Sequence, residues 1–277
     1  MRNLIELTDL TANEIQKIFN IADKLNKGEY EKCLEGKTII LFFQSSSIRT
    51  RVTFEKGIFD LGGQSILFPS DKLDKKEDIK DVVNYLHNWA DCIIVRHTNI
   101  DLIAQMAECK LLPIINAMSG VNHPCEILSD LYSLSKIRSD YLDLNYLFVG
   151  APGNIGNAWA EAKKVLGINI KQCCPAGYEI SGLTTEHDIN KAIVNRDIIL
   201  TDSLPSKALP DFSPYQITNE LMQNANIGAM LNPCPPFFRG EEVSADIINS
   251  KYFIGYSFKK NLLNMHQAIM YFSMFND

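Results

Sequence analysis

The sequence lacks the patterns that mark several large classes of protein. No apolar run approaches the roughly 20 residues that a membrane-spanning helix needs. Residues 1–16 are charged and amphipathic, which argues against a secretory signal peptide. The seven cysteines form an odd set without a C-x-x-C pair. Free thiols in a reducing cytoplasm are the simplest interpretation of that set.

An excess of positive charge is also missing. The formal net charge is -6 and the pI is near 5.4, so a nucleic-acid partner is not expected. The missing apolar run likewise means that no membrane partner is expected. The chain does have 277 residues, of which 46% are hydrophobic. That is enough for two domains with cores of their own in an ordinary globular protein.

Residues 38–61 predict a strand, a tight turn and a helix. Thr38 to Phe43 is an apolar, β-branched run that is typical of a buried strand in a parallel sheet. After the polar turn 44–47, apolar residues recur at helical spacing until two glycines end the pattern. The helical positions are Val52, Phe54, Ile58, Phe59 and Leu61.

The first turn of this helix carries an unusual charge. Ser47, Arg49, Thr50 and Arg51 lie beside free backbone N–H groups and the positive end of the helix dipole. Because positive side chains are unfavourable there unless an anion compensates them, the pattern predicts a site for a small, doubly charged anion. The alternative is that Ser47 caps the helix and the arginines are surface charges.

Two other strand ends point to the same kind of site. Residues 91–96 predict a buried strand that ends in Arg96. Residues 111–116 predict another, followed by a helix that begins at Pro124 with His123 before it. Ligands of open α/β sheets bind outside the carboxyl ends of strands, so Arg96 and His123 are candidates to meet the same anion. A surface arginine and a capping histidine are the alternatives.

The second half of the chain predicts a second domain, which begins near the polar stretch 137–145. Residues 144–167 predict another strand, turn and helix. Their glycines do not have the G-x-G-x-x-G spacing, and no acidic residue follows about 20 positions later. A nicotinamide-dependent oxidoreductase is therefore the weakest functional hypothesis. Strands are predicted over 197–200 and 229–231, and an apolar helix over 260–277.

Several of these stretches resemble the aspartate/ornithine carbamoyltransferase family. Residues 47–51, Ser-Ile-Arg-Thr-Arg, resemble its Ser-Thr-Arg-Thr-Arg signature, and residues 123–131 resemble its His-Pro-x-Gln-x-Leu-x-Asp-Leu motif. Residues 173–179 are similar to a Pro-x-Gly-Tyr-Glu stretch of the ornithine enzymes. The resemblance extends over nearly the whole chain.

The resemblance implies a fold of two α/β domains. Each is a doubly wound, mostly parallel sheet, and an interdomain cleft separates them. Residues 1–137, completed by a C-terminal helix over 258–277, would bind carbamoyl phosphate, and residues 138–257 would bind an amino acid or amine. The enzyme would transfer the carbamoyl group, with ornithine as the default acceptor and citrulline as product, in arginine metabolism. No metal and no cofactor is needed.

The resemblance also assigns roles to single residues. The groups that would bind the phosphate are Ser47, Arg49, Thr50 and the backbone N–H of Ile48. Arg96, His123 and Thr50 would face the carbonyl oxygen, and the predicted catalytic residues are Arg96, His123 and Arg49. The other predicted substrate-binding residues are Glu126, Asn154, Asp202, Ser206, Cys234 and Pro235.

The sequence departs from the family at several positions. Glu126 replaces a glutamine, and its carboxylate would repel a phosphate unless it is protonated or paired. Leu262 stands where the last helix carries an arginine, Lys207 replaces a methionine, and Asn232 replaces a histidine. Another amine as acceptor therefore stays open, as does a weakly catalytic paralogue that binds a phosphorylated metabolite.

The resemblance finally implies a cytoplasmic homotrimer with shared active sites. The charged segment 70–81 has the composition of a solvated loop, but in the family the matching loop reaches a neighbouring subunit's site. Lys75, Lys76 or Lys80 would serve there, and the sequence does not choose among them.

Overall fold

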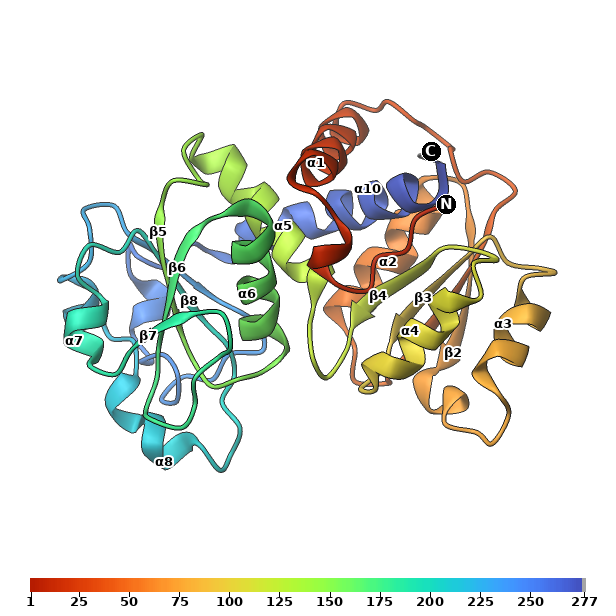
Figure 1. Ribbon diagram of the computed structural model, residues 1–277. Coiled ribbons are helices and arrows are strands. Elements are labelled where there is room, and N and C mark those ends of the chain that lie inside the picture. Colours follow the sequence, from red (N-terminus) through yellow and green to blue (C-terminus); the bar gives the residue numbers. More distant parts are fainter. Residues whose placement is uncertain (276–277) are drawn as a thin grey trace. The chain divides into compact units, whose positions relative to one another are not determined.

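The computed structural model describes residues 1–275, which belong to two compact units (Figure 1). Unit 1 contains Met1–Ser133 and the segment that starts at Lys259, and unit 2 is Leu134–Phe258. The last two positions of the predicted C-terminal helix, 276 and 277, lie outside the described residues. No helix within residues 1–275 is long and apolar enough to cross a membrane.

Unit 1 contains a four-stranded parallel sheet in the order β2-β1-β3-β4. The strands are β1 (Thr38–Phe43), β2 (Gln64–Pro69), β3 (Cys92–Arg96) and β4 (Ile114–Met118). The chain passes from β1 to β2, which lies on one side of β1, and then crosses to β3, which lies on the other side of β1. The strand order therefore reverses between β1 and β3, and such a switch point is where open α/β sheets bind ligands.

Helices cover both faces of this sheet (Figure 1). On one face α10 (Leu262–Phe275) packs against α1 (Ala12–Asn26) and α2 (Arg49–Asp60). On the other, α3 (Ile79–Leu86) and α4 (Ile100–Glu108) share a hydrophobic core with β1, β3 and β4. The helix α5 (Pro124–Ile137) begins in unit 1, and the chain enters unit 2 within it.

Two details of unit 1 differ from the sequence pattern. Val52 and Phe59 fit the predicted helical spacing, but both are exposed on α2, whose buried face is built from Phe54, Gly57 and Ile58. The segment 70–81 is only partly a solvated loop, because Leu73 is buried in the core. The apolar spacing alone could not separate a buried face from an exposed one.

Unit 2 contains a five-stranded parallel sheet in the order β7-β6-β5-β8-β9. The strands are β5 (Asn145–Val149), β6 (Asn169–Cys173), β7 (Thr184–Glu186), β8 (Ile198–Thr201) and β9 (Met230–Pro233). The helices are α6 (Asn154–Leu166), α7 (Ile189–Ala192), α8 (Leu209–Phe212) and α9 (Asn219–Met222). Here the strand order reverses between β5 and β8.

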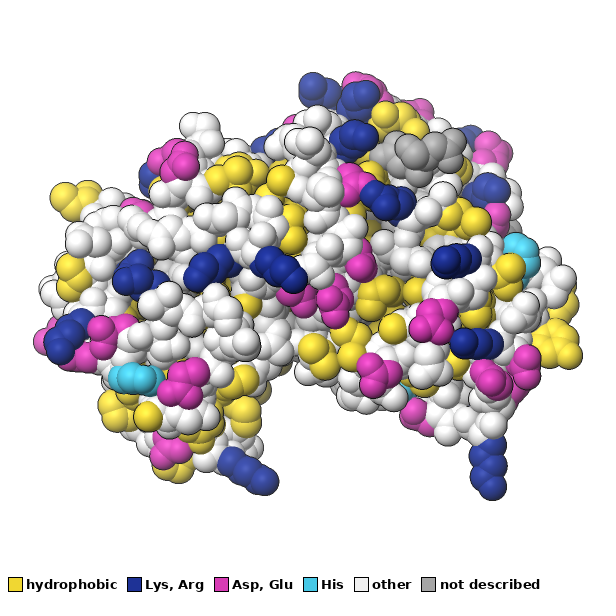
Figure 2. Space-filling model, in the orientation of Figure 1, with side chains coloured by type: hydrophobic (Ala, Val, Ile, Leu, Met, Phe, Trp, Pro, Cys, Tyr) yellow, Lys and Arg dark blue, Asp and Glu magenta, His cyan; other side chains and the backbone are white. Residues whose placement is uncertain are grey.

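The predicted fold class is confirmed, since each unit is a parallel sheet covered by helices. All seven cysteines are free, and the adjacent pair Cys173 and Cys174 packs in the core of unit 2. Figure 2 shows acidic and basic side chains interspersed on the face that it draws.

Candidate active site

The turn between β1 and α2 leaves polar groups without partners. Ile48 occupies the N-cap position of α2, and no side chain caps this helix. Ser47 therefore does not act as the cap that the simpler interpretation required. Its hydroxyl Oγ is buried and has no hydrogen-bond partner among residues 1–275. Because a buried polar atom without a partner is costly, the turn is suited to a ligand that accepts or donates a hydrogen bond there.

The two arginines of the first helical turn differ in their surroundings. Arg51 donates from Nε to Oε1 of Glu55 at 2.9 Å, so its charge is balanced within the helix. Arg49 is exposed, and its side chain has no hydrogen bond or ion pair among the described residues. Of these two arginines, Arg49 therefore remains available as a cation for a ligand at this helix end.

Arg96 connects β3 with α2 across the switch point. The pairing register between β3 and β4 shifts between Val95 and Arg96, at the carboxyl end of the strand. From there Arg96 donates through Nη1 to Oγ1 of Thr50 at 3.2 Å. Arg96 and Thr50, which are 46 positions apart, therefore lie side by side.

The loop after β4 fixes the position of His123. Asn116 donates through Nδ2 to Oδ1 of Asn122 at 2.7 Å, and Oγ of Ser119 donates to the same oxygen at 2.9 Å. A Cβ at Gly120 would lie 2.8 Å from the carbonyl oxygen of Thr98, so only glycine fits there. The backbone before His123 is therefore held rigidly.

His123 is buried, neutral and close to the other candidates. Burial lowers its pKa to about 4, Glu126 opposes this effect, and the charges of Arg96 and Lys259 add to it. Its ring atom Nδ1 is buried without a hydrogen-bond partner among residues 1–275. Like Ser47, His123 thus presents an unsatisfied polar atom.

Glu126 lies one helical turn after His123 and is paired. Lys259 Nζ is 2.7 Å from Glu126 Oε1 and 2.5 Å from Asp130 Oδ1. Burial alone would raise the pKa of Glu126, but the charge and the hydrogen bond of Lys259 outweigh this effect and lower the pKa. The carboxylate is therefore ionised and paired. Lys259 and Asp130 were missed from the sequence, although a glutamate beside a predicted phosphate site already called for a cation.

The candidates of unit 1 therefore lie in one cluster and in the turn next to it. Thr50, Arg96, His123 and Glu126 form one cluster at the carboxyl edge of the sheet. Ser47 and Arg49 belong to the turn that carries Thr50, as does the exposed Ile48. Leu262 is a buried apolar residue at the start of α10 and supplies no charge.

Unit 2 places its candidates at its own switch point. Asn154 is the first residue of α6, after the turn that follows β5. A Cβ at Gly153 in this turn would lie 3.8 Å from Oδ2 of Asp202, which follows β8. Cys234 N–H donates to the carbonyl of Thr201 at 2.9 Å, which joins the ends of β8 and β9.

The remaining candidates of unit 2 lie near these strand ends. Pro235 directly follows Cys234 after β9, and its peptide bond to Pro236 is cis. Ser206 and Lys207 are exposed, so neither side chain is fixed by burial. Asn232 is buried in β9.

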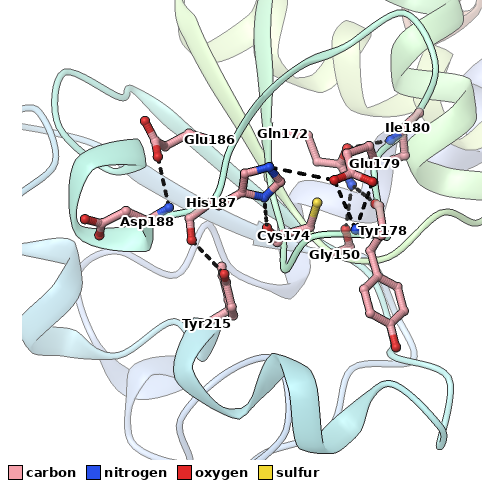
Figure 3. Close-up of polar contacts among 11 residues, drawn as sticks. Gly150, Gln172, Cys174, Tyr178, Glu179, Ile180, Glu186, His187, Asp188 and Tyr215 are labelled. Carbon is pink, nitrogen blue, oxygen red and sulfur yellow. Dashed lines mark hydrogen bonds and ion pairs between the residues drawn. The ribbon is translucent and has the colours of Figure 1, made fainter.

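A buried glutamine supports the turn before Asn154 (Figure 3). Gln172 donates through Nε2 to the carbonyl oxygens of Gly150 at 2.9 Å and Tyr178 at 2.8 Å, and its Oε1 accepts from the N–H of Ile180 at 2.7 Å. All its amide groups are thus used to tie the end of β5 to residues 175–180. Sequence reasoning missed Gln172, since a single glutamine in a strand carries no pattern.

Volume alone does not locate the site. A groove of about 820 Å³ in unit 1 is lined by residues 1–9 and the end of α4, and none of the predicted site residues lines it. Within residues 1–275 no group of three His, Cys, Asp or Glu side chains is arranged to hold a metal ion.

The chain matches two family descriptions over most of its length. Residues 2–136 match "Aspartate/ornithine carbamoyltransferase, carbamoyl-P binding domain", and residues 142–273 match "Aspartate/ornithine carbamoyltransferase, Asp/Orn binding domain". The ornithine carbamoyltransferase of Methanosphaera stadtmanae is 32% identical, with 98% of each chain covered. That of Desulfotalea psychrophila is 29% identical, with 97% of each covered.

A solved structure shares the architecture. The ornithine carbamoyltransferase from Pyrococcus furiosus has a TM-score of 0.92 at 29% sequence identity, and the match covers 100% of this chain and 98% of that one.

Proposed function

The chain belongs to the aspartate/ornithine carbamoyltransferase family, and on that premise we propose that it transfers the carbamoyl group of carbamoyl phosphate to ornithine, giving citrulline. The chain is an enzyme of the carbamoyltransferase class, as its relatives are. The observation that carries the proposal is the cluster in unit 1. Two unsatisfied buried atoms, Ser47 Oγ and His123 Nδ1, accompany the linked pair Arg96 and Thr50.

Unit 1 is the proposed binding unit for carbamoyl phosphate. Ser47, Arg49, Thr50 and the backbone N–H of Ile48 hold the phosphate at the first turn of α2, where the helix dipole favours an anion. This assignment uses the hydroxyl that lacks a partner and the arginine that Glu55 does not balance. Glu126 accepts a hydrogen bond from the carbamoyl NH₂.

Arg96 and His123 act on the carbonyl oxygen in this proposal. When the neutral amine attacks the carbonyl carbon, negative charge develops on this oxygen and phosphate then leaves. A fixed guanidinium and an N–H of the neutral imidazole stabilise that charge, and removing one such donor typically costs about 10²–10³ in rate. The pKa of His123, about 4, keeps the ring neutral at pH 7.

Unit 2 is the proposed binding unit for the amino acid. Asp202 pairs with the α-amino group, Asn154 binds the ornithine backbone, and Ser206 is a further contact. The backbone carbonyls of Cys234 and Pro235 bind the carbamoyl amine. The placement of Asn154, Asp202 and Cys234 after the neighbouring strands β5, β8 and β9 supports this assignment.

We also propose that the enzyme is a cytoplasmic homotrimer. Apolar side chains are exposed on α2 and on the end strand β2, namely Val52, Phe59, Ile66 and Phe68. Exposed apolar side chains favour a protein contact, here with a second copy. Lys75 and Lys76 are exposed, whereas Lys80 pairs with Glu108, so Lys75 and Lys76 are the better candidates to reach a neighbouring copy. Seven free thiols suit the cytoplasm.

A light-scattering measurement tests the assembly. The chain mass is 31.2 kDa, so the trimer scatters with about three times this mass, and Phe59→Asp lowers it towards the monomer. A wild-type monomer at micromolar concentration contradicts the proposed trimer.

The activity is tested by calorimetry and by a colorimetric assay for citrulline. Wild-type protein is expected to bind carbamoyl phosphate, and Arg49→Ala to bind it at least about tenfold more weakly, because charge-assisted hydrogen bonds are lost. Arg51→Ala is the matched control, since Glu55 already balances Arg51. Absent binding, or equal binding by Arg49→Ala, rejects the proposal.

A panel of amines then identifies the acceptor. Turnover with ornithine alone supports the proposed substrate, and turnover only with another amine replaces it. Binding of carbamoyl phosphate without turnover of any amine favours a protein that only binds the phosphorylated metabolite.

A further inference from the structure

Lys259 bridges two buried carboxylates that belong to one helix. Its ammonium lies 2.7 Å from Oε1 of Glu126 and 2.5 Å from Oδ1 of Asp130. The exposed fractions of the three side chains are 19%, 8% and 4% for Lys259, Glu126 and Asp130. These positions are about 130 residues apart in sequence, so the bridge is a feature of the folded unit.

The chain segment that carries Lys259 is anchored on the same helix. Two residues later, Asn261 donates through Nδ2 to Oγ of Ser133 at 3.1 Å. Glu126, Asp130 and Ser133 follow one another at helical spacing, so they lie on one face of α5. The segment before α10 therefore runs along this face and holds the ammonium over the two carboxylates.

The summed charge of Lys259, Glu126 and Asp130 affects the neighbouring anion site. Two carboxylates and one ammonium sum to one negative charge, and without Lys259 the sum is two. His123 is three positions before Glu126, and the charges of Glu126, Arg96 and Lys259 all act on its ring. Two uncompensated carboxylates on this face of α5 would repel an anion bound near His123. The repulsion is strong in a partly dry site.

We propose that Lys259 is a positioning residue for the anion site of unit 1: it fixes the carboxylate of Glu126 and offsets its charge, so that a phosphate dianion binds beside it. The inference rests on the proposed function, because it takes the first turn of α2 as the phosphate site and the adjacent Arg96 and His123 as the site of the carbonyl oxygen. Oε1 of Glu126 is occupied by Lys259, and Oε2 has no hydrogen-bond partner among residues 1–275. This second oxygen remains an acceptor for an N–H group of the bound ligand.

The affinity for phosphate is expected to follow the summed charge of Lys259, Glu126 and Asp130. The variant Lys259→Met raises the negative charge from one to two, and Glu126→Gln in the same chain restores it to one. Isothermal titration with inorganic phosphate is expected to show a dissociation constant at least about tenfold higher for Lys259→Met. The double variant is expected within about threefold of wild type, and Glu126→Gln alone at least as tight as wild type.

The neighbouring residue provides a matched control. Lys260 is exposed and has no hydrogen bond or ion pair among the described residues, so Lys260→Met removes the same charge outside the cluster. Its phosphate affinity is expected to stay within about twofold of wild type.

Removing one partner of a buried ion pair often destabilises a protein by about 3–5 kcal/mol, so folding is checked by circular dichroism. If Lys259→Met does not fold, phosphate affinity is measured on two other variants. These are the double variant Lys259→Met with Glu126→Gln, and the triple variant that adds Asp130→Asn. Both are expected to bind phosphate within about threefold of wild type, and a folded variant that binds tenfold more weakly overturns the proposal.

The outcomes separate this inference from the proposed function. A wild-type protein that binds no phosphate defeats the function and the inference together. If wild type binds phosphate and forms citrulline while Lys259→Met matches it, only the role of Lys259 is overturned. A double variant no tighter than Lys259→Met also overturns it, since a purely structural loss is not rescued by Glu126→Gln.

Discussion

The two units place the same structural element, a strand followed by a turn and a helix, at a sheet switch point. In unit 1 the element is β1–α2, and in unit 2 it is β5–α6. Neither helix has a side-chain cap or an acidic residue in its first turn. Both helix ends thus leave backbone N–H groups to a ligand or to solvent.

The side chains around the two turns differ in charge. The β1–α2 turn faces Arg96, which donates to Thr50, and it also carries Arg49. The β5–α6 turn instead lies against a carboxylate, with Oδ2 of Asp202 close to Gly153. The proposed function therefore assigns an anion to this backbone frame in unit 1 and a cation to it in unit 2, according to the residues at the next strand end.

The largest loss of activity should follow removal of the Arg96 guanidinium in unit 1. Arg96→Ala is expected to lower kcat/KM for carbamoyl phosphate about 10²–10³-fold, because a fixed donor to the developing charge is lost. Steady-state kinetics measure this. The control Arg51→Ala should stay within about threefold, and equal losses in the two variants would show that general surface charge, rather than the cluster, attracts the ligand.

Acid should destabilise unit 1 through its buried histidines. Burial lowers the pKa of His123 to about 4 and that of His266 to about 3. The unfolded chain then binds more protons below pH 6.5, so stability is lost as pH falls from about 6.5 towards 4. His123 alone contributes about 2 kcal/mol of loss between pH 7 and pH 5.

Urea unfolding at pH 7 and pH 5 measures this loss. His123→Asn should reduce the difference between the two pH values by about 2 kcal/mol. An unchanged difference in this variant would mean that His123 is already protonated or solvated in the folded protein.

Removing the anion of unit 2 should act on the other substrate. Asp202→Asn is expected to raise KM for ornithine about 10- to 50-fold, since a charge-assisted contact to the ammonium group is weakened, while KM for carbamoyl phosphate stays within about twofold. Asp143→Asn, an exposed acidic residue of the same unit, is the control. Equal shifts in the two KM values would remove the contrast between the units.

The smallest effect is expected at Ser47. Ser47→Ala removes a single neutral hydroxyl from the anion site, and such a hydrogen bond contributes about 0.5–1.5 kcal/mol. Phosphate affinity should therefore fall about 3- to 10-fold. The unfolding free energy should not fall, because Oγ has no partner in the protein. A loss of stability without a loss of affinity would return Ser47 to a structural role.

The sequence predicted several buried strands, because these strands are local apolar runs, but it did not predict β6 and β7. Residues 38–43 form β1 as predicted. The exposed side of α2 could not be predicted, because Val52 and Phe59 have the spacing of buried residues yet face away from the core of unit 1. The helical spacing of these residues does not show whether a second copy of the chain covers them.

The candidate site residues carry local sequence patterns, whereas the residues that support them are distant in sequence and were missed. The motif around Ser47 and the one around His123 both carry local patterns. Lys259 meets Glu126 only through the path of the folded chain, and Gln172 works through three backbone contacts that no motif records. The charge of Glu126 was the one local sign that a partner was needed.

The most direct test of the anion site is a crystal structure of the wild-type protein soaked in inorganic phosphate. Phosphate is expected at the first turn of α2, with oxygens about 2.7–3.2 Å from Ser47 Oγ and from the guanidinium of Arg49. Phosphate bound only elsewhere, for example in the groove lined by residues 1–9 and the end of α4, would contradict this expectation.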